Sequence, residues 1–133
     1  AMALGADGVQ VGSRFVATPE ASSHPHFKSE VLKAEQGSTE LTLKELTPVR
    51  LLKNPFYDQI KKLYAEGASS EKLKEVLGRG RAKKGMFEGD LVEGELEIGQ
   101  VAAQIESLLP AETIVQEFIA TYNTTLERLA PLD

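Results

Sequence analysis

The feature that most constrains this chain is a short apolar run that leads straight into a glycine, a serine and a helix start. Gly8-Val9-Gln10-Val11 sets β-branched residues between glycines, and this pattern predicts a buried strand of a parallel sheet. Gly12 ends the strand. The residues from Ser13 to Ala17 then predict one or two helical turns before Pro19, because proline cannot continue a helix.

This order of strand, glycine, hydroxyl and helix is suited to holding a phosphate. The N–H groups at the start of a helix favour an anion, glycine permits close approach, and the Ser13 hydroxyl adds a donor. In (β/α)₈ barrels a phosphate commonly sits on such an element after strands seven and eight. From these residues alone, an ordinary helix start with a serine cap is the preferred interpretation.

The rest of the chain predicts further short elements separated by glycines and prolines. Ala1 to Gly5 has the pattern of a last helical turn ended by a glycine. The other expected elements are a helix entered through Ser22 or Ser23 and Pro25 and stopped at Gly37, strands from Thr39 to Leu43 and from Val49 to Lys53, a helix from Asn54-Pro55 to Gly67, a helix capped by Ser69 or Ser70 and closed by Gly78, an amphipathic helix carrying Val101, Ile105, Leu108 and Leu109, and a last helix beginning at Pro110.

Gly78 to Gln100 holds six glycines and both signs of charge, so we expect repeated turns and either a domain boundary or a site loop there. Its basic cluster could meet a phosphorylated cofactor or an acidic carrier protein. A solvated mixed-charge loop is the preferred interpretation, because five carboxylates follow at once. The cluster is Arg79, Arg81, Lys83 and Lys84, and the carboxylates are Glu88, Asp90, Glu93, Glu95 and Glu97.

His24 and His26 flank Pro25, and Glu20 lies four positions before His24. A metal site or a general base is one interpretation of this group. No third ligand has metal-binding spacing, so exposed histidines at a helix entry are the preferred interpretation. We therefore predict no metal site.

Charge and composition exclude several functional classes. A net charge of −5 with scattered basic residues argues against a nucleic-acid or anionic-membrane surface. The absence of cysteine excludes disulfides and thiolate chemistry, so a cytoplasmic location is expected. No apolar run approaches the roughly 20 residues that span a bilayer. The expected partners are small molecules or other proteins.

Five segments occur in order along the chain: ALGADGVQVGSRFVATPEA, HPHFK, PVRLLKNPF, GRGRAKKGMFEGDLVEGELEIGQVA and the closing helix. Together they resemble the C-terminal portion of the nitronate monooxygenase (2-nitropropane dioxygenase) family, which includes enoyl-acyl-carrier-protein reductase II. The resemblance implies an α/β fold, namely the C-terminal part of an FMN-binding TIM (β/α)₈ barrel with a mostly helical inserted domain. It places the end of helix 7, strand 8 and the phosphate turn in residues 1–20, the inserted domain in 21–88, and helices returning to the barrel in 89–133.

The same resemblance implies that Gln10, Val11, Gly12 and Ser13 bind the FMN phosphate, since they match the family's Gln-Val/Met-Gly-Thr/Ser motif. The family's catalytic histidine has no counterpart here, so no catalytic residue is predicted in this segment. The implied activity of the intact protein is oxidation of alkyl nitronates with molecular oxygen. The alternative within the family is NAD(P)H-dependent reduction of an enoyl thioester on acyl carrier protein.

A hypothesis from another class is a non-enzymatic helical interaction module whose apolar helices dock on a partner. Because a single eighth strand cannot close a barrel, we expect these residues alone to form a mostly helical fragment. Little or no FMN affinity is expected of that fragment, and a homo-oligomer is among its expected states.

Overall fold

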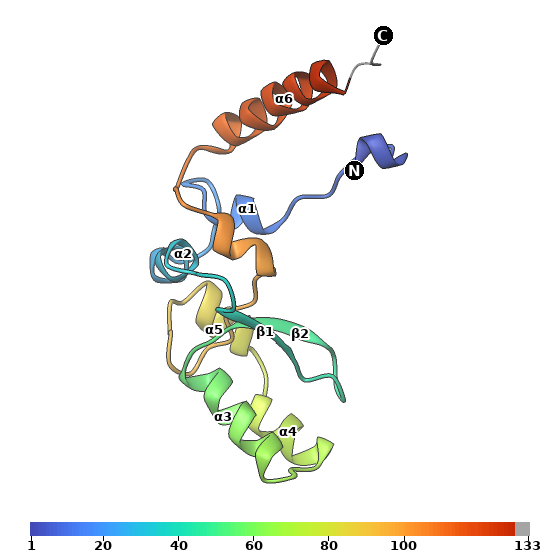
Figure 1. Cartoon of the computed structure of the whole chain (residues 1–133). Coiled ribbons are helices and arrows are strands. Elements are labelled where there is room, and N and C mark those ends of the chain that lie inside the picture. The colour runs from blue at the N-terminus through green and yellow to red at the C-terminus, as the bar shows by residue number, and fades with distance from the viewer. Residues whose placement is uncertain (130–133) are drawn as a thin grey trace.

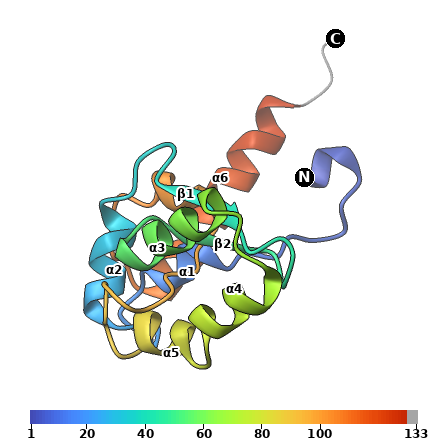
Figure 2. The same cartoon turned by 90° about the horizontal axis from the view of Figure 1, so that it is seen from below.

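The structure is a computed structural model that describes residues 1–129. Figure 1 shows a body built from α1 to η2, residues 13–104, with the last helix α6 and the N-terminal segment extending together to one end. Figure 2 shows the same two segments projecting to one side of the body. The elements are η1 (Met2–Leu4), α1 (Ser13–Val16), α2 (Pro25–Leu32), β1 (Thr39–Thr42), β2 (Val49–Leu52), α3 (Pro55–Ala65), α4 (Ser70–Leu77), α5 (Arg81–Met86), η2 (Gln100–Gln104) and α6 (Ala111–Arg128).

The two predicted strands are confirmed as an antiparallel hairpin. β1 pairs with β2 from Thr39↔Leu52 to Thr42↔Val49. The segment around Glu97 lies along the other edge of β2, where the Leu52 N–H donates to the Leu96 carbonyl at 2.8 Å. This contact brings the end of the glycine-rich stretch onto the hairpin.

Helices α3 and α4 begin as predicted, because each has a side-chain cap. The Asn54 side-chain oxygen accepts from the Tyr57 N–H at 2.9 Å, and Pro55 occupies the first turn. The Ser69 hydroxyl accepts from the Lys72 N–H at 3.3 Å. The Asn54 amide also donates to the Leu91 and Gly94 carbonyls at 2.9 Å each, so the cap ties α3 to a distant loop.

The predicted serine cap of α2 is wrong. Pro25 is the first helical residue, so the preceding residue, His24, becomes the cap. Its Nδ1 accepts from the His26 N–H at 3.1 Å. Ser23 instead donates its hydroxyl to the Val16 carbonyl at 2.9 Å. The helix ends at Leu32, and Gly37, with a φ of 87°, lies in the turn before β1.

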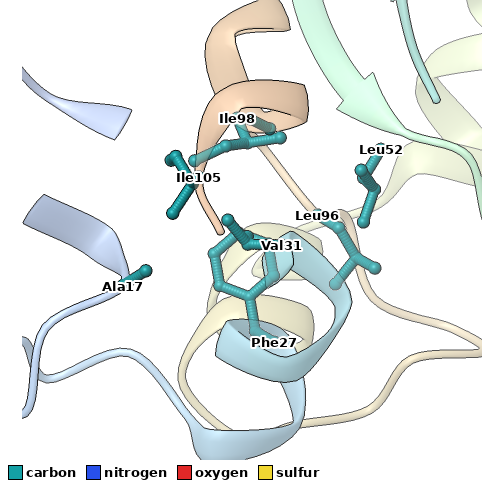
Figure 3. Close-up of a cluster of buried hydrophobic side chains, with 8 residues drawn as sticks. Ala17, Phe27, Val31, Leu52, Leu96, Ile98 and Ile105 are labelled. Carbon is teal, nitrogen blue, oxygen red and sulfur yellow. The ribbon is translucent and has the colours of Figure 1, made fainter. Parts of the chain in front are cut away.

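A first buried cluster forms the centre of the body (Figure 3). Phe27 and Val31 from α2 lie at its middle and are almost fully buried. The cluster contains Ala17, Phe27, Val31, Leu52, Leu96, Ile98, Ala102 and Ile105. It draws side chains from all three of the predicted ranges 1–20, 21–88 and 89–133, and that division into domains stays a prediction.

A second buried cluster joins the hairpin to α3 and consists of Leu43, Leu51, Phe56 and Ile60. The Arg81 guanidinium lies 4.8 Å from the centre of the Phe56 ring, so α5 covers one side of this cluster.

The predicted strand from Gly8 to Val11 is not formed. Val9 and Val11 are 67% and 37% exposed, and the sheet formed by the described residues has two strands, β1 and β2. A strand requires neighbours for its N–H and C=O groups, and no segment in residues 1–129 pairs with this one. The expected barrel strand is therefore absent from this structure. The predicted end of a helical turn at Gly5 is observed, because Gly5 ends η1 in the left-handed conformation with a φ of 91°.

The helix predicted around Val101 to Leu109 is also wrong. The chain forms only the short 3₁₀ segment η2, and Ile105 then turns to an extended conformation with φ −95° and ψ 97°. This path buries Ala102 and Ile105 in the first cluster, and tertiary packing overrides the helical spacing. The glycine-rich stretch before it contains one helix that the sequence did not predict, α5.

Candidate functional site

The four residues predicted to bind the FMN phosphate lie together where the extended N-terminal segment enters α1. Gln10, Val11 and Gly12 are exposed, and Ser13 is half-buried as the first residue of the helix. They form one wall of a groove of about 640 Å³ between α1, η2 and α6. The groove is lined by Gln10, Val11, Gly12, Ser13, Arg14, Val101, Gln104, Ile105, Ile114, Glu117, Phe118 and Thr121.

The Ser13 hydroxyl takes part in a long-range hydrogen bond. The Gly99 N–H, from the residue before η2, donates to Ser13 Oγ at 3.1 Å. A hydroxyl that accepts one hydrogen bond still has its own proton to donate. Ser13 therefore keeps a donor for an anion in the groove.

Gly12 leaves space beside this hydroxyl. A Cβ added to Gly12 would meet no atom within 4 Å. No side chain caps α1, so the helix start offers backbone N–H donors next to that space. Open space, backbone donors and a hydroxyl donor fit the requirements of a phosphate group.

Two charged side chains of opposite sign also line the groove. The Arg14 guanidinium donates to the Ser107 carbonyl at 3.0 Å, which ties α1 to the segment before α6. Glu117 lines the groove from α6. The charge of the groove is therefore balanced, and selectivity for an anion has to come from the donors at Gly12 and Ser13.

The two histidines have structural contacts. His24 caps α2, and His26 Nδ1 lies 3.2 Å from the Gly89 carbonyl oxygen. Glu20 accepts from the Ala111 N–H at the start of α6 at 3.1 Å. Among residues 1–129, no three His, Asp or Glu side chains are placed to hold a metal ion.

Three of the four residues in the basic cluster are paired with the acidic residues that follow them. Arg81 pairs with Glu93 at 2.8 Å, Lys83 with Glu88 at 3.0 Å, and Lys84 with Asp90 at 3.2 Å. The structure therefore supports a mixed-charge loop at these three residues. The fourth, Arg79, is exposed just before α5.

Two features of this region were not predicted from the sequence. Glu95 is buried, and burial together with the nearby Glu97 raises its pKa to about 7. Gly99 contacts Ser13 although the two residues are 86 positions apart. Hydrophobic periodicity does not predict a contact between residues so far apart in the sequence. The one sequence feature that pointed to Gly99 was its place within a segment that resembles the family.

Comparison with known proteins identifies the family. The model of the nitronate monooxygenase family matches residues 1–121. The chain therefore belongs to the nitronate monooxygenase family, which confirms the resemblance drawn from its motifs.

Individual relatives agree with this assignment. The chain is similar to the structure of FabK from Thermotoga maritima, with 34% identity, a TM-score of 0.87, and coverage of 96% of this chain and 40% of FabK. The M276A mutant of the same protein matches at 33% identity with a TM-score of 0.81, covering 96% of this chain and 38% of the mutant. A probable nitronate monooxygenase from Bacillus subtilis (strain 168) is 45% identical over 42 residues, which are 32% of this chain and 12% of that protein. The chain thus spans about two fifths of FabK and a smaller share of the bacillus relative.

In the part of the chain that the structure describes, no helix has both the length and the apolar character needed to cross a membrane.

Proposed function

We propose that this chain is part of an FMN-dependent oxidoreductase, in which Gln10, Val11, Gly12 and Ser13 bind the FMN phosphate. The observation that carries the proposal is the groove at α1, where a hydroxyl and backbone N–H groups surround open space beside Gly12. Membership of the nitronate monooxygenase family supports the same cofactor.

Each of these residues has a distinct part in the proposed site. Ser13 donates its hydroxyl proton to a phosphate oxygen while Gly99 holds the oxygen of that hydroxyl. Gly12 allows the phosphate to approach the backbone, and Gln10 and Val11 form the adjoining wall. When bound, FMN supplies the reversible acceptance and donation of electrons that a side chain cannot provide.

The activity we propose for the intact protein is oxidation of alkyl nitronates, with molecular oxygen as the final electron acceptor. The match to the nitronate monooxygenase family over residues 1–121 supports this choice. The alternative is NAD(P)H-dependent reduction of an enoyl thioester on acyl carrier protein, and the similarity to FabK over 96% of this chain supports it.

The basic cluster does not favour the alternative. An acidic carrier protein would need accessible positive charge, whereas Arg81, Lys83 and Lys84 are each in an ion pair within the chain. In our proposal the partner is therefore a small-molecule substrate. We also propose that the protein self-associates. A cytoplasmic location is part of the same proposal and rests on the absence of cysteine.

The test is purification of the intact protein followed by absorbance in the flavin bands and two activity assays. We expect one FMN per chain and oxygen consumption that depends on an added nitronate. NADH oxidation that depends on a crotonyl thioester, without nitronate turnover, would assign the reductase activity. An intact protein that binds no flavin would favour the third hypothesis, a helical interaction module.

A further inference from the structure

We propose that Gly99 is a positioning residue for the cofactor phosphate, acting through Ser13. This inference rests on the proposed function, because it takes the groove at α1 as the phosphate site. The observation behind it is the hydrogen bond in which the Gly99 N–H donates to Ser13 Oγ at 3.1 Å. Gly99 itself does not line the groove.

The hydrogen bond restricts how the Ser13 hydroxyl can point. An unbound serine hydroxyl rotates freely about its Cβ–O bond. Once a lone pair of Oγ is engaged by a fixed backbone donor, fewer orientations remain for the proton. The proton is then held ready for an acceptor in the groove, and less rotational freedom is lost when a phosphate binds.

A side chain at position 99 would disturb this contact. A Cβ added there would lie 2.7 Å from Ser13 Oγ and 3.9 Å from Ser13 Cβ, so Ser13 would have to rotate or the two segments would have to separate. The backbone itself would accept alanine, because Gly99 has φ −69° and ψ 158°. The Gly99→Ala substitution therefore changes the contact with Ser13 without adding backbone strain.

The position of Gly99 makes the contact a link between distant parts of the chain. Gly99 directly follows Ile98, which is buried in the first cluster, and it directly precedes η2, whose residues Val101 and Gln104 line the groove. The packed body therefore fixes the donor, and the donor fixes the hydroxyl at the edge of the exposed groove.

The experiment is a double-mutant cycle on the intact protein, with the dissociation constant of FMN measured by flavin fluorescence. Ser13→Ala removes the hydroxyl, and we expect it to weaken FMN binding by about 10- to 100-fold, as for loss of one hydrogen bond to a charged group. We expect Gly99→Ala to weaken binding about 3- to 10-fold in the native background. In the Ser13→Ala background, the same change should have little further effect, because Gly99 acts through the hydroxyl.

A matched control and a second measurement separate positioning from general damage. Gln100→Ala alters the next residue, which is exposed, and should leave FMN affinity unchanged. Hydrogen exchange at the Gly99 amide should be faster in Ser13→Ala and slower in the native protein when FMN is bound. This readout needs no substitution at Gly99, so it holds even where Gly99→Ala fails to fold.

The outcomes are distinct. Additive effects in the cycle, or a Gly99 amide whose exchange ignores both Ser13 and FMN, would overturn the positioning role while leaving the flavin proposal intact. A native protein that binds no FMN would instead overturn the proposed function.

Discussion

The body and α6 use apolar residues at similar helical spacing but bury them to very different degrees. Phe27 and Val31 of α2 are 1% and 0% exposed, because the hairpin and residues 96–105 close over them. On α6 only Ile114 is buried, whereas Phe118 and Ile119 are 48% and 56% exposed. An amphipathic pattern thus predicts a helix and a face, and burial follows only where the chain supplies a surface for that face.

The N-terminal segment belongs with α6 in this comparison. Both extend from the body in Figures 1 and 2. They line an apolar groove of about 440 Å³ formed by Ala1, Met2, Val9, Phe118, Ile119, Thr121, Tyr122, Thr125, Leu126 and Leu129. Apolar surface left in water in this way promotes association, whereas the apolar side chains of the two buried clusters in the body are already covered.

The largest expected difference is between two phenylalanines. Phe27→Ala leaves a cavity in the first cluster and should lower the free energy of unfolding by about 3 to 5 kcal/mol. Phe118→Ala should lower it by less than about 1 kcal/mol, because that ring is half exposed. Chemical denaturation of the 133-residue chain measures both. Equal losses of unfolding free energy in the two variants would show that α6 packs as firmly as the body. That result would contradict the difference in burial between the two regions.

A smaller effect concerns the buried Glu95, whose pKa is raised from 4.5 to about 7 by burial and by Glu97, against the opposing influence of Arg81. The folded state then binds the proton more tightly than the unfolded state. Its stabilising contribution is present below about pH 4.5 and is lost as the pH rises towards 7. Glu95→Gln removes this dependence, so between pH 5 and pH 8 the native chain should lose on the order of 2 kcal/mol relative to the variant.

The measurement is the free energy of unfolding by chemical denaturation at several pH values. Glu106→Gln is the matched control, since Glu106 is exposed, and its pH profile should follow that of the native chain. Parallel profiles for the native chain and Glu95→Gln would contradict the raised pKa.

The smallest effect on stability is expected on the exposed face of α6. Ile119→Lys should change the free energy of unfolding by no more than about 0.5 kcal/mol, yet it should reduce self-association of the isolated chain by placing a charge in the apolar groove. Analytical ultracentrifugation compares it with Asn123→Lys, which adds the same charge outside the residues that line that groove. If both variants associate as the native chain does, the apolar face is not responsible.

Local signals predicted the elements that depend on local contacts. Asn54-Pro55 and Ser69 capped their helices as expected, and both strands that flank Pro48 formed, although their pairing with each other was not predicted. The cap of α2 was predicted wrongly as a serine, although a proline in the first helical position makes the residue before it, His24, the cap. Helix α5 in the glycine-rich stretch was not predicted, because it has no side-chain cap that the sequence could indicate. Its first residue, Arg81, instead donates hydrogen bonds to the Leu77 and Val76 carbonyls.

The site was predictable only in part. The residues from Gln10 to Ser13 could be proposed because a phosphate turn is a local arrangement of backbone and hydroxyl groups. That they line one groove with Val101 and Gln104 depends on how η2 and α6 lie against α1, and no local pattern contains that information.

The sequence by itself determined the caps of α3 and α4, the two short strands, and the family that its motifs match, because these depend on residues a few positions apart. The tertiary structure decided which apolar faces are covered, that Gly8 to Val11 stays unpaired, and that Gly99 meets Ser13. The physical reason is that burial and long-range hydrogen bonds need a second segment brought into contact, and only the packed chain specifies which segment that is.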